Sequence, residues 1–160
     1  MRLSTAISTR LQHQHTALQG IIQGLTADRL KEHPNPGKWS PFENIAHLAA
    51  YQPVFLDRID RIRKEESPIF ERYVAEQDPH FPEFLDKTPS ALIQAIDERG
   101  AEIAHQLSGW DEVSLRRTGR HQKYGLLTMA QWSEFYLLHE AHHLFVIFML
   151  VQDLRSGGEK

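Results

Sequence analysis

The strongest hydrophobic pattern in the chain runs from Thr128 to Leu154, a stretch without glycine or proline. Thr128 followed by Gln131 has the form of a helix-opening capping box, and Arg155 followed by a serine and two glycines marks a helix end. At 100° per residue, one face of this helix carries an apolar stripe with two histidines at its centre. The stripe consists of Trp132, Phe135, Tyr136, His139, His143, Val146 and Leu150. The pattern predicts a long helix that turns both histidines toward the core.

Three further stretches repeat apolar residues at helical spacing. The first covers residues 4–25, where His15 lies in or beside the apolar stripe. The second opens with Ser-Pro-x-Glu at residues 40–43, which supplies an N-cap, a proline at the first helical position and a capping glutamate, and it continues to Ile62. The third follows Thr88 and Pro89 and ends near Leu107. The chain is therefore expected to form four amphipathic helices.

Two long stretches between these helices lack helical periodicity. Residues 64–89 are charged and then proline-rich, and we interpret them as a long crossover connection of the kind that joins parallel neighbours in a bundle. Residues 109–127 are irregular and locally basic, with no convincing strand pattern. We therefore predict one domain over residues 1–160, an all-α four-helix bundle with a long crossover.

Composition narrows the class of partner. The 160 residues carry a net charge of -3, with 41% hydrophobic and 24% charged residues, so neither nucleic acid nor an anionic membrane surface is an expected partner. The apolar run 144–151 is far shorter than the roughly 20 residues of a membrane span, and the N-terminal residues show no apolar signal core. We expect a soluble, cytoplasmic protein.

The chain has no cysteine. This excludes disulfides, thiolate metal sites and a cysteine nucleophile, so any metal ligands must be nitrogen or oxygen donors.

The two histidines of the last predicted helix stand four residues apart. Imidazoles at that spacing project from consecutive turns and can bind one metal ion. With Glu140 between them, they also match H-E-x-x-H, the metalloprotease motif. The rest of the protease pattern is missing, because no histidine follows His143 and the only downstream glutamate, Glu159, lies in a glycine-rich tail. We therefore disfavour a protease.

A third ligand is expected from upstream, and His47 is the best candidate. It lies near the start of the second helix, at the edge of its apolar face. Three imidazoles suit Zn²⁺, Ni²⁺ or Fe²⁺ and leave positions open for water or substrate. The alternative is three core histidines held by hydrogen bonds. A histidine pair centred on an apolar stripe favours the metal site.

Two motifs together resemble a known family. WSPxExxxHL at residues 39–48 and GRHxxxGxxTxxxWxxFxxxHExHHL at residues 119–144 are similar to the DinB-like superfamily of damage-inducible and metal-dependent enzymes. The resemblance implies a four-helix bundle with a long crossover, often a homodimer. It also implies a divalent ion bound by His47, His139 and His143, which leaves His142 as a neighbour.

The resemblance further implies a small-molecule reaction, either transfer of a low-molecular-weight thiol to an electrophile or, second, hydrolysis. Glu140, next to a proposed ligand, is the candidate to orient that ligand or to act as a catalytic base. Arg120 and His121, just before the last helix, are candidates to bind an anionic substrate. A rival hypothesis is a non-catalytic metal-binding or dimer-interaction module, which would show no turnover with any thiol or electrophile.

Overall fold

The structure, a computed structural model, describes residues 3–157. Glu159 therefore lies outside the described residues. Three of the predicted long helices form as single elements: α4 (Pro41–Lys64), α6 (Pro89–Ser108) and α8 (Met129–Gly157). Both predicted capping boxes form. In one, the Ser40 hydroxyl accepts from the Glu43 N–H while the Glu43 carboxylate accepts from the Ser40 N–H.

The predicted first helix is broken into three pieces: α1 (Thr5–His13), the 3-10 turn η1 (Gln14–Thr16) and α2 (Ala17–Ile22). The break lies where two side chains are used by other helices. The Gln14 amide donates to the Leu137 carbonyl of α8 at 2.8 Å, and His15 is buried against α6. These tertiary contacts override a helical periodicity that was otherwise correct.

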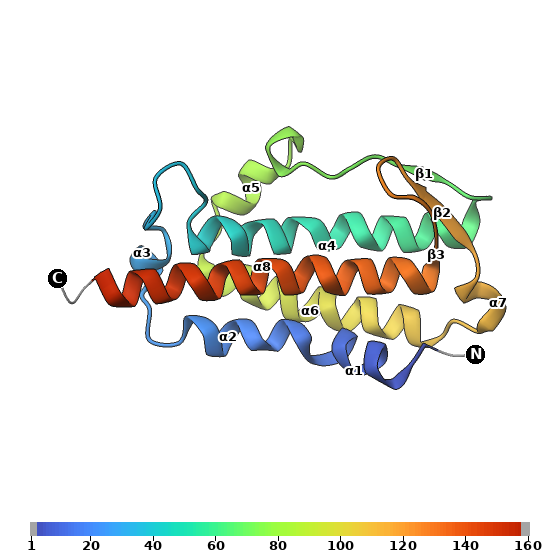
Figure 1. Cartoon of the computed structure of the whole chain (residues 1–160), viewed down its shortest axis with the longest axis horizontal. Coiled ribbons are helices and arrows are strands. Elements are labelled where there is room, and N and C mark those ends of the chain that lie inside the picture. The colour runs from blue at the N-terminus through green and yellow to red at the C-terminus, as the bar shows by residue number, and fades with distance from the viewer. Residues whose placement is uncertain (1–2, 158–160) are drawn as a thin grey trace.

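The four helical segments form a bundle with a crossover along its outside (Figure 1). α4 packs against both α6 and α8, and the first segment packs against α6 and α8 on the other side. α4 and α6 run in the same direction, so the chain between them must return along the whole bundle. That return carries β1 (Ile69–Phe70), the 3-10 turn η2 (Ala75–Gln77) and α5 (Phe81–Leu85). The predicted four-helix bundle with a long crossover is confirmed.

The prediction that no strand forms was wrong. β2 (Thr118–His121) and β3 (Gly125–Thr128) form an antiparallel hairpin, and β1 pairs in parallel with β2. The strands have only two to four residues, and β1 lies about fifty residues from its partner β2 in the sequence, so no local alternation marks them. The hairpin leads directly into α8 and is tied to it, because the Trp132 indole donates to the Gly119 carbonyl at 3.2 Å. The remaining short helices are α3 (Ala27–Leu30) and α7 (Glu112–Leu115).

The buried face of α8 differs from the predicted one. Its most deeply buried side chains include Leu137, Glu140 and Ile147, whereas His139 and His143 are only half-buried. The histidines thus face a cavity between α8, α4 and the crossover rather than the centre of the core. By length and composition alone α8 could cross a membrane, a test that core helices of soluble proteins also pass.

Candidate metal centre

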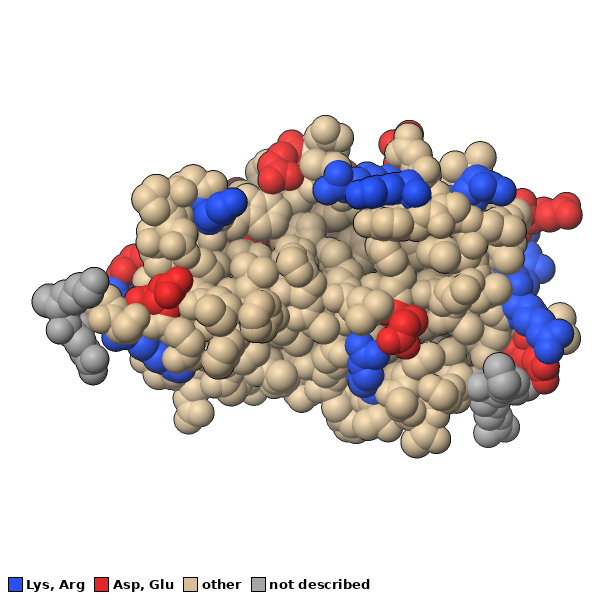
Figure 2. Space-filling view, in the orientation of Figure 1, with Lys and Arg blue, Asp and Glu red and all other residues tan. Residues whose placement is uncertain are grey.

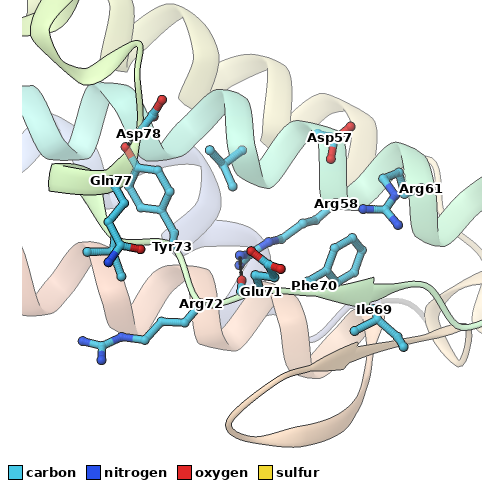
Figure 3. A pocket seen from close by; sticks show the side chains of 12 residues that line it. Asp57, Arg58, Arg61, Ile69, Phe70, Glu71, Arg72, Tyr73, Gln77 and Asp78 are labelled. Carbon is cyan, nitrogen blue, oxygen red and sulfur yellow. Dashed lines mark hydrogen bonds between the residues drawn. The ribbon is translucent and has the colours of Figure 1, made fainter.

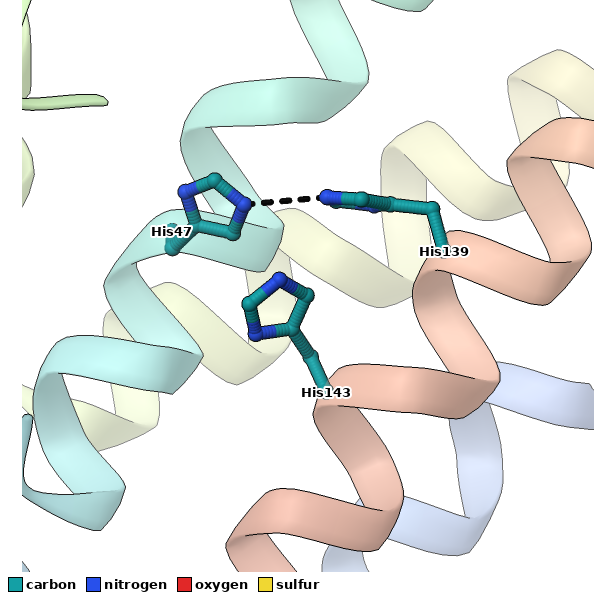
Figure 4. A group of neighbouring side chains, drawn as sticks. All are labelled: His47, His139 and His143. Atoms are coloured by element: carbon teal, nitrogen blue, oxygen red, sulfur yellow. Dashed lines mark hydrogen bonds between the residues drawn. The ribbon is translucent and has the colours of Figure 1, made fainter. Parts of the chain in front are cut away.

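Three histidines from two helices converge on one point (Figure 4). His47 comes from α4, and His139 and His143 come from consecutive turns of α8. The Nε2 atoms of His47 and His139 lie 3.0 Å apart, and the ring of His143 lies 4.3 Å from that of His47 and 4.7 Å from that of His139, centroid to centroid. One ligand nitrogen from each of the three rings lies within 4.8 Å of the others. The three residues selected from the sequence are thus brought together.

Asn44 fixes the orientation of one of these rings. The His143 Nδ1–H donates to the Asn44 Oδ1 at 2.9 Å, and the Asn44 amide in turn donates to the Ser40 carbonyl at 3.0 Å. Because Nδ1 carries the proton, Nε2 of His143 keeps its lone pair, and Figure 4 shows that nitrogen directed at the His47–His139 contact. The helix start that caps α4 therefore also sets the tautomer of His143.

All three imidazoles are held neutral. Burial lowers the pKa of His47 to about 4, of His139 to about 3 and of His143 to about 2. For His139 and His143, repulsion from the neighbouring histidines lowers the pKa further. For His47 the second influence is Glu76, which opposes the shift. At neutral pH each ring therefore offers a lone pair, which is the form that binds a metal ion.

The three residues fit a divalent ion. The Nε2 atoms of His47 and His139 face each other, and Asn44 holds the Nδ1 of His143, so one nitrogen of each ring is directed at the same point. Two nitrogens bound to one ion at about 2.1 Å are about 3.0 Å apart at a right angle and about 3.4 Å apart at the tetrahedral angle. The observed 3.0 Å separation falls at the lower end of that range.

A cavity of about 460 Å³ opens beside the three histidines. One wall comes from α4 and α8, and the facing wall comes from the crossover and the β2–β3 hairpin. Aromatic rings make up much of the surface, and two arginines and one glutamate supply its formal charges. The lining residues used below are Tyr51, Arg58, Arg72, Tyr73, Glu76, His121 and Phe135.

Glu140 does not reach this cavity. A helix turns 100° between neighbours, so with His139 at the cavity Glu140 points into the core, where it is 3% exposed. Its carboxylate accepts hydrogen bonds from the Gln14 amide at 2.9 Å and the Tyr136 hydroxyl at 3.4 Å. Burial raises its pKa to about 7. Glu140 therefore lies away from the ligand nitrogens that it was expected to orient or to assist as a base, and the protease motif is matched in spacing only.

Of the two residues expected to meet an anion, the structure brings only His121 to the cavity. Neighbours on a strand point to opposite faces, so His121 faces inward and is buried while Arg120 is exposed to solvent. The Nδ1 of His121 accepts from the backbone N–H groups of Lys123 and Tyr124 at 3.0 and 3.2 Å. His142 is exposed at the cavity rim, and His15 packs elsewhere, against α6.

Sequence reasoning missed Asn44, Arg58 and the crossover residues of the cavity wall. Asn44 lies three residues before His47 and therefore on the same side of α4, which is a usable signal. Nothing in the sequence places Arg72 or Tyr73 near the histidines, because their position depends on the path of the crossover.

Comparisons with known proteins agree with this architecture. The chain matches the sequence model of the DinB superfamily over residues 10–147. Its fold is similar to that of YfiT from Bacillus subtilis, described as a probable metal-dependent hydrolase with an unusual four-helix bundle topology. That match has a TM-score of 0.80 at 18% identity and covers 95% of this chain and 86% of the other. No curated protein matched in a sequence search.

Proposed function

Because this chain belongs to the DinB superfamily, we propose that it is a divalent-metal-dependent enzyme whose ion is bound by His47, His139 and His143. The observation that carries the proposal is the convergence of three neutral imidazoles on the wall of a cavity. Three histidine ligands leave part of the coordination sphere free, which is the pattern of a catalytic site rather than of a structural one. Zn²⁺, Ni²⁺ and Fe²⁺ all suit this donor set.

The proposed reaction is hydrolysis of a small electrophilic substrate. The bound ion would lower the pKa of a nucleophile and polarise the substrate. Around it, Asn44 holds His143 in the required tautomer, and the aromatic walls keep bulk water from the substrate. The description of YfiT supports hydrolysis, although its likeness to this chain extends to the fold alone. Thiol transfer, implied by the family resemblance, is the second candidate.

Metal content tests the first half of the proposal. Protein purified without a histidine tag is expected to carry close to one divalent ion per chain, measured by inductively coupled plasma mass spectrometry. His47→Ala should be largely metal-free, because loss of one of three ligands lowers metal affinity by more than the roughly 10- to 100-fold typical of losing a residue that only hydrogen-bonds a ligand. Two controls, His142→Ala and a truncation after Arg155, should keep full occupancy. Metal retained by His47→Ala but lost on truncation would contradict the site.

Turnover tests the second half. The metal-loaded protein should hydrolyse at least one member of a panel of small esters, lactones and amides, and His47→Ala should not. The same panel with added low-molecular-weight thiols separates transfer from hydrolysis, since a transferase consumes the thiol. A metal-loaded protein without turnover under either condition would be a binding module instead.

A further inference from the structure

The end of the cavity away from the histidines is basic. Arg58 of α4 and Arg72 of the crossover both line it, and both also line a neighbouring hollow of about 600 Å³. Figure 3 shows Arg58 reaching from α4 to the crossover, and Arg72 extending away from the other side chains drawn. The two guanidinium groups thus belong to different elements that meet at this end of the cavity.

Arg58 is buried without a counter-ion. It is 4% exposed, and within the part of the chain that the structure describes no carboxylate pairs with it. Its guanidinium donates to the Tyr51 hydroxyl and to the Glu71 carbonyl, both at 2.9 Å, and lies 5.1 Å from the Trp132 ring centroid. These neutral partners offset only part of the cost of burying a charge, since buried charges are normally paired.

The hydroxyl group of Tyr51 is free to donate a hydrogen bond. Its hydroxyl oxygen accepts from Arg58, and among residues 3–157 no group accepts the hydroxyl hydrogen. A tyrosine hydroxyl ordinarily carries its proton at neutral pH, so this group can still donate. The ring packs on His139 with centroids 4.2 Å apart. Tyr51 therefore connects the basic end of the cavity with the histidine end.

The charges along the cavity are unevenly placed. Arg72 is exposed and forms no ion pair or side-chain hydrogen bond with the described residues. Glu76 is the one carboxylate among the lining residues, and it acts on His47 at the other end. Two positive charges therefore face one negative charge, an excess that suits one anionic group and not two.

We propose that the basic end binds the carboxylate of a small, singly charged substrate, between the guanidinium groups of Arg58 and Arg72 and the hydroxyl of Tyr51. The substrate body would then lie along the aromatic wall formed by Tyr51, Tyr73 and Phe135, with its reacting group at the histidines. This inference rests on the proposed function, because it takes the cavity as the substrate site. It transfers to Arg58 and Arg72 the anion-binding role that the sequence suggested for Arg120.

Benzoate and benzamide are suitable probes, because they have nearly the same shape and differ in charge. Calorimetric titration of the metal-loaded protein should show benzoate binding about tenfold or more tightly than benzamide, the ratio expected from one or two charge-assisted hydrogen bonds. Arg72→Gln should reduce that ratio severalfold. Arg58→Gln and Tyr51→Phe should reduce the ratio as well. Arg72 is exposed to solvent, so its replacement is the variant that should disturb folding least.

Arg120→Gln is the matched control, an exposed arginine of β2 whose loss should leave the ratio unchanged. The proposal is overturned if benzoate does not bind, if it binds no better than benzamide, or if the ratio survives in Arg72→Gln. If the benzoate carboxylate instead bound directly to the ion, the ratio would survive in Arg72→Gln. Because the readout is binding and not turnover, a failure here is distinguishable from a missing hydrolase activity, and a missing activity leaves the benzoate ratio intact.

Discussion

At the scale of single residues, the histidine site depends on a neutral amide as well as on its ligands. Asn44 accepts from the Nδ1–H of His143 and donates to the Ser40 carbonyl, so its own amide cannot easily turn over. An amide turned the other way would present N–H to Nδ1 and would favour the tautomer with its lone pair on the wrong nitrogen. Asn44 therefore selects the form of His143 that can bind an ion.

Asn44→Ala should weaken metal affinity about 10- to 100-fold, the usual effect of losing the hydrogen-bond partner of a ligating histidine. A competition titration with a chromogenic chelator measures this change. Gln52→Ala is the matched control, because Gln52 is also a buried amide of α4 but bonds to the Ile96 carbonyl and the Tyr136 hydroxyl. Equal losses of affinity in the two variants would mean that Asn44 supports α4 and not the histidine.

The sequence could identify the histidines but not their surroundings. His139 and His143 were found because helical spacing alone places them together, and His47 because it lies at the edge of an apolar face near a capped helix start. The position of Glu140 was misjudged because a step of one residue rotates a side chain by 100°, enough to move it from the cavity to the core. Which face of α8 is buried depends on how the bundle packs. Arg58 was missed because a charged residue inside a helix normally faces solvent.

At the scale of elements, the first helical segment approaches α6 closely through one glycine. A Cβ at Gly100 would lie 2.8 Å from two atoms of the His15 ring, which is 6% exposed and packed in place. The small residue thus lets a buried imidazole lie directly on the backbone of the neighbouring helix.

Gly100→Ala should therefore destabilise the protein by about 1–3 kcal/mol through overpacking, even though alanine is the better helix former. Gly20→Ala in α2 is a natural control: an added Cβ there meets nothing within 4 Å, so this change should be neutral or stabilise by about 0.5–1 kcal/mol. Urea unfolding followed by circular dichroism measures both. If Gly100→Ala is as stable as Gly20→Ala, the close approach does not constrain the pair of helices.

Helices were easier to predict than the elements between them. Local capping sequences at Ser40, Thr88 and Thr128 mark the helix starts, and all three side chains accept a capping hydrogen bond in the structure. Each strand depends on pairing with another strand, which for β1 lies about fifty residues away, and two to four residues are too few to show a period. The gap in the first helix has the same origin, since Gln14 and His15 bond or pack against other helices.

At the scale of the whole molecule, α8 presents an apolar stripe to solvent. Leu138, Phe145, Phe148 and Met149 are 57, 63, 43 and 45% exposed. Figure 2 shows a broad surface without charged side chains between the charged groups at the left end and one red and blue pair right of centre. A stripe with no charge of either sign can pack against its own copy without repulsion. We propose that it forms the interface of a homodimer, the assembly that the family resemblance implies.

Light scattering coupled to size-exclusion chromatography should then give a dimer for the unmodified chain and a monomer for Phe145→Glu, because two buried carboxylates would face each other across a two-fold contact. Val113→Glu, at an apolar residue of α7 that is 76% exposed and far from the stripe in the chain, should remain dimeric. A monomeric unmodified chain at high concentration would contradict the proposal.

The separation of the histidines along the chain has a consequence for the kinetics of folding. His47 and His139 are 92 residues apart, and the crossover, α6 and the hairpin all lie between them. Closing so long a loop is entropically slow, so the site exists only after α4 and α8 have found each other. An ion captured at that late stage stabilises the folded state more than the species that precede it. Its main effect is therefore to slow unfolding, and it should leave the rate of folding nearly unchanged.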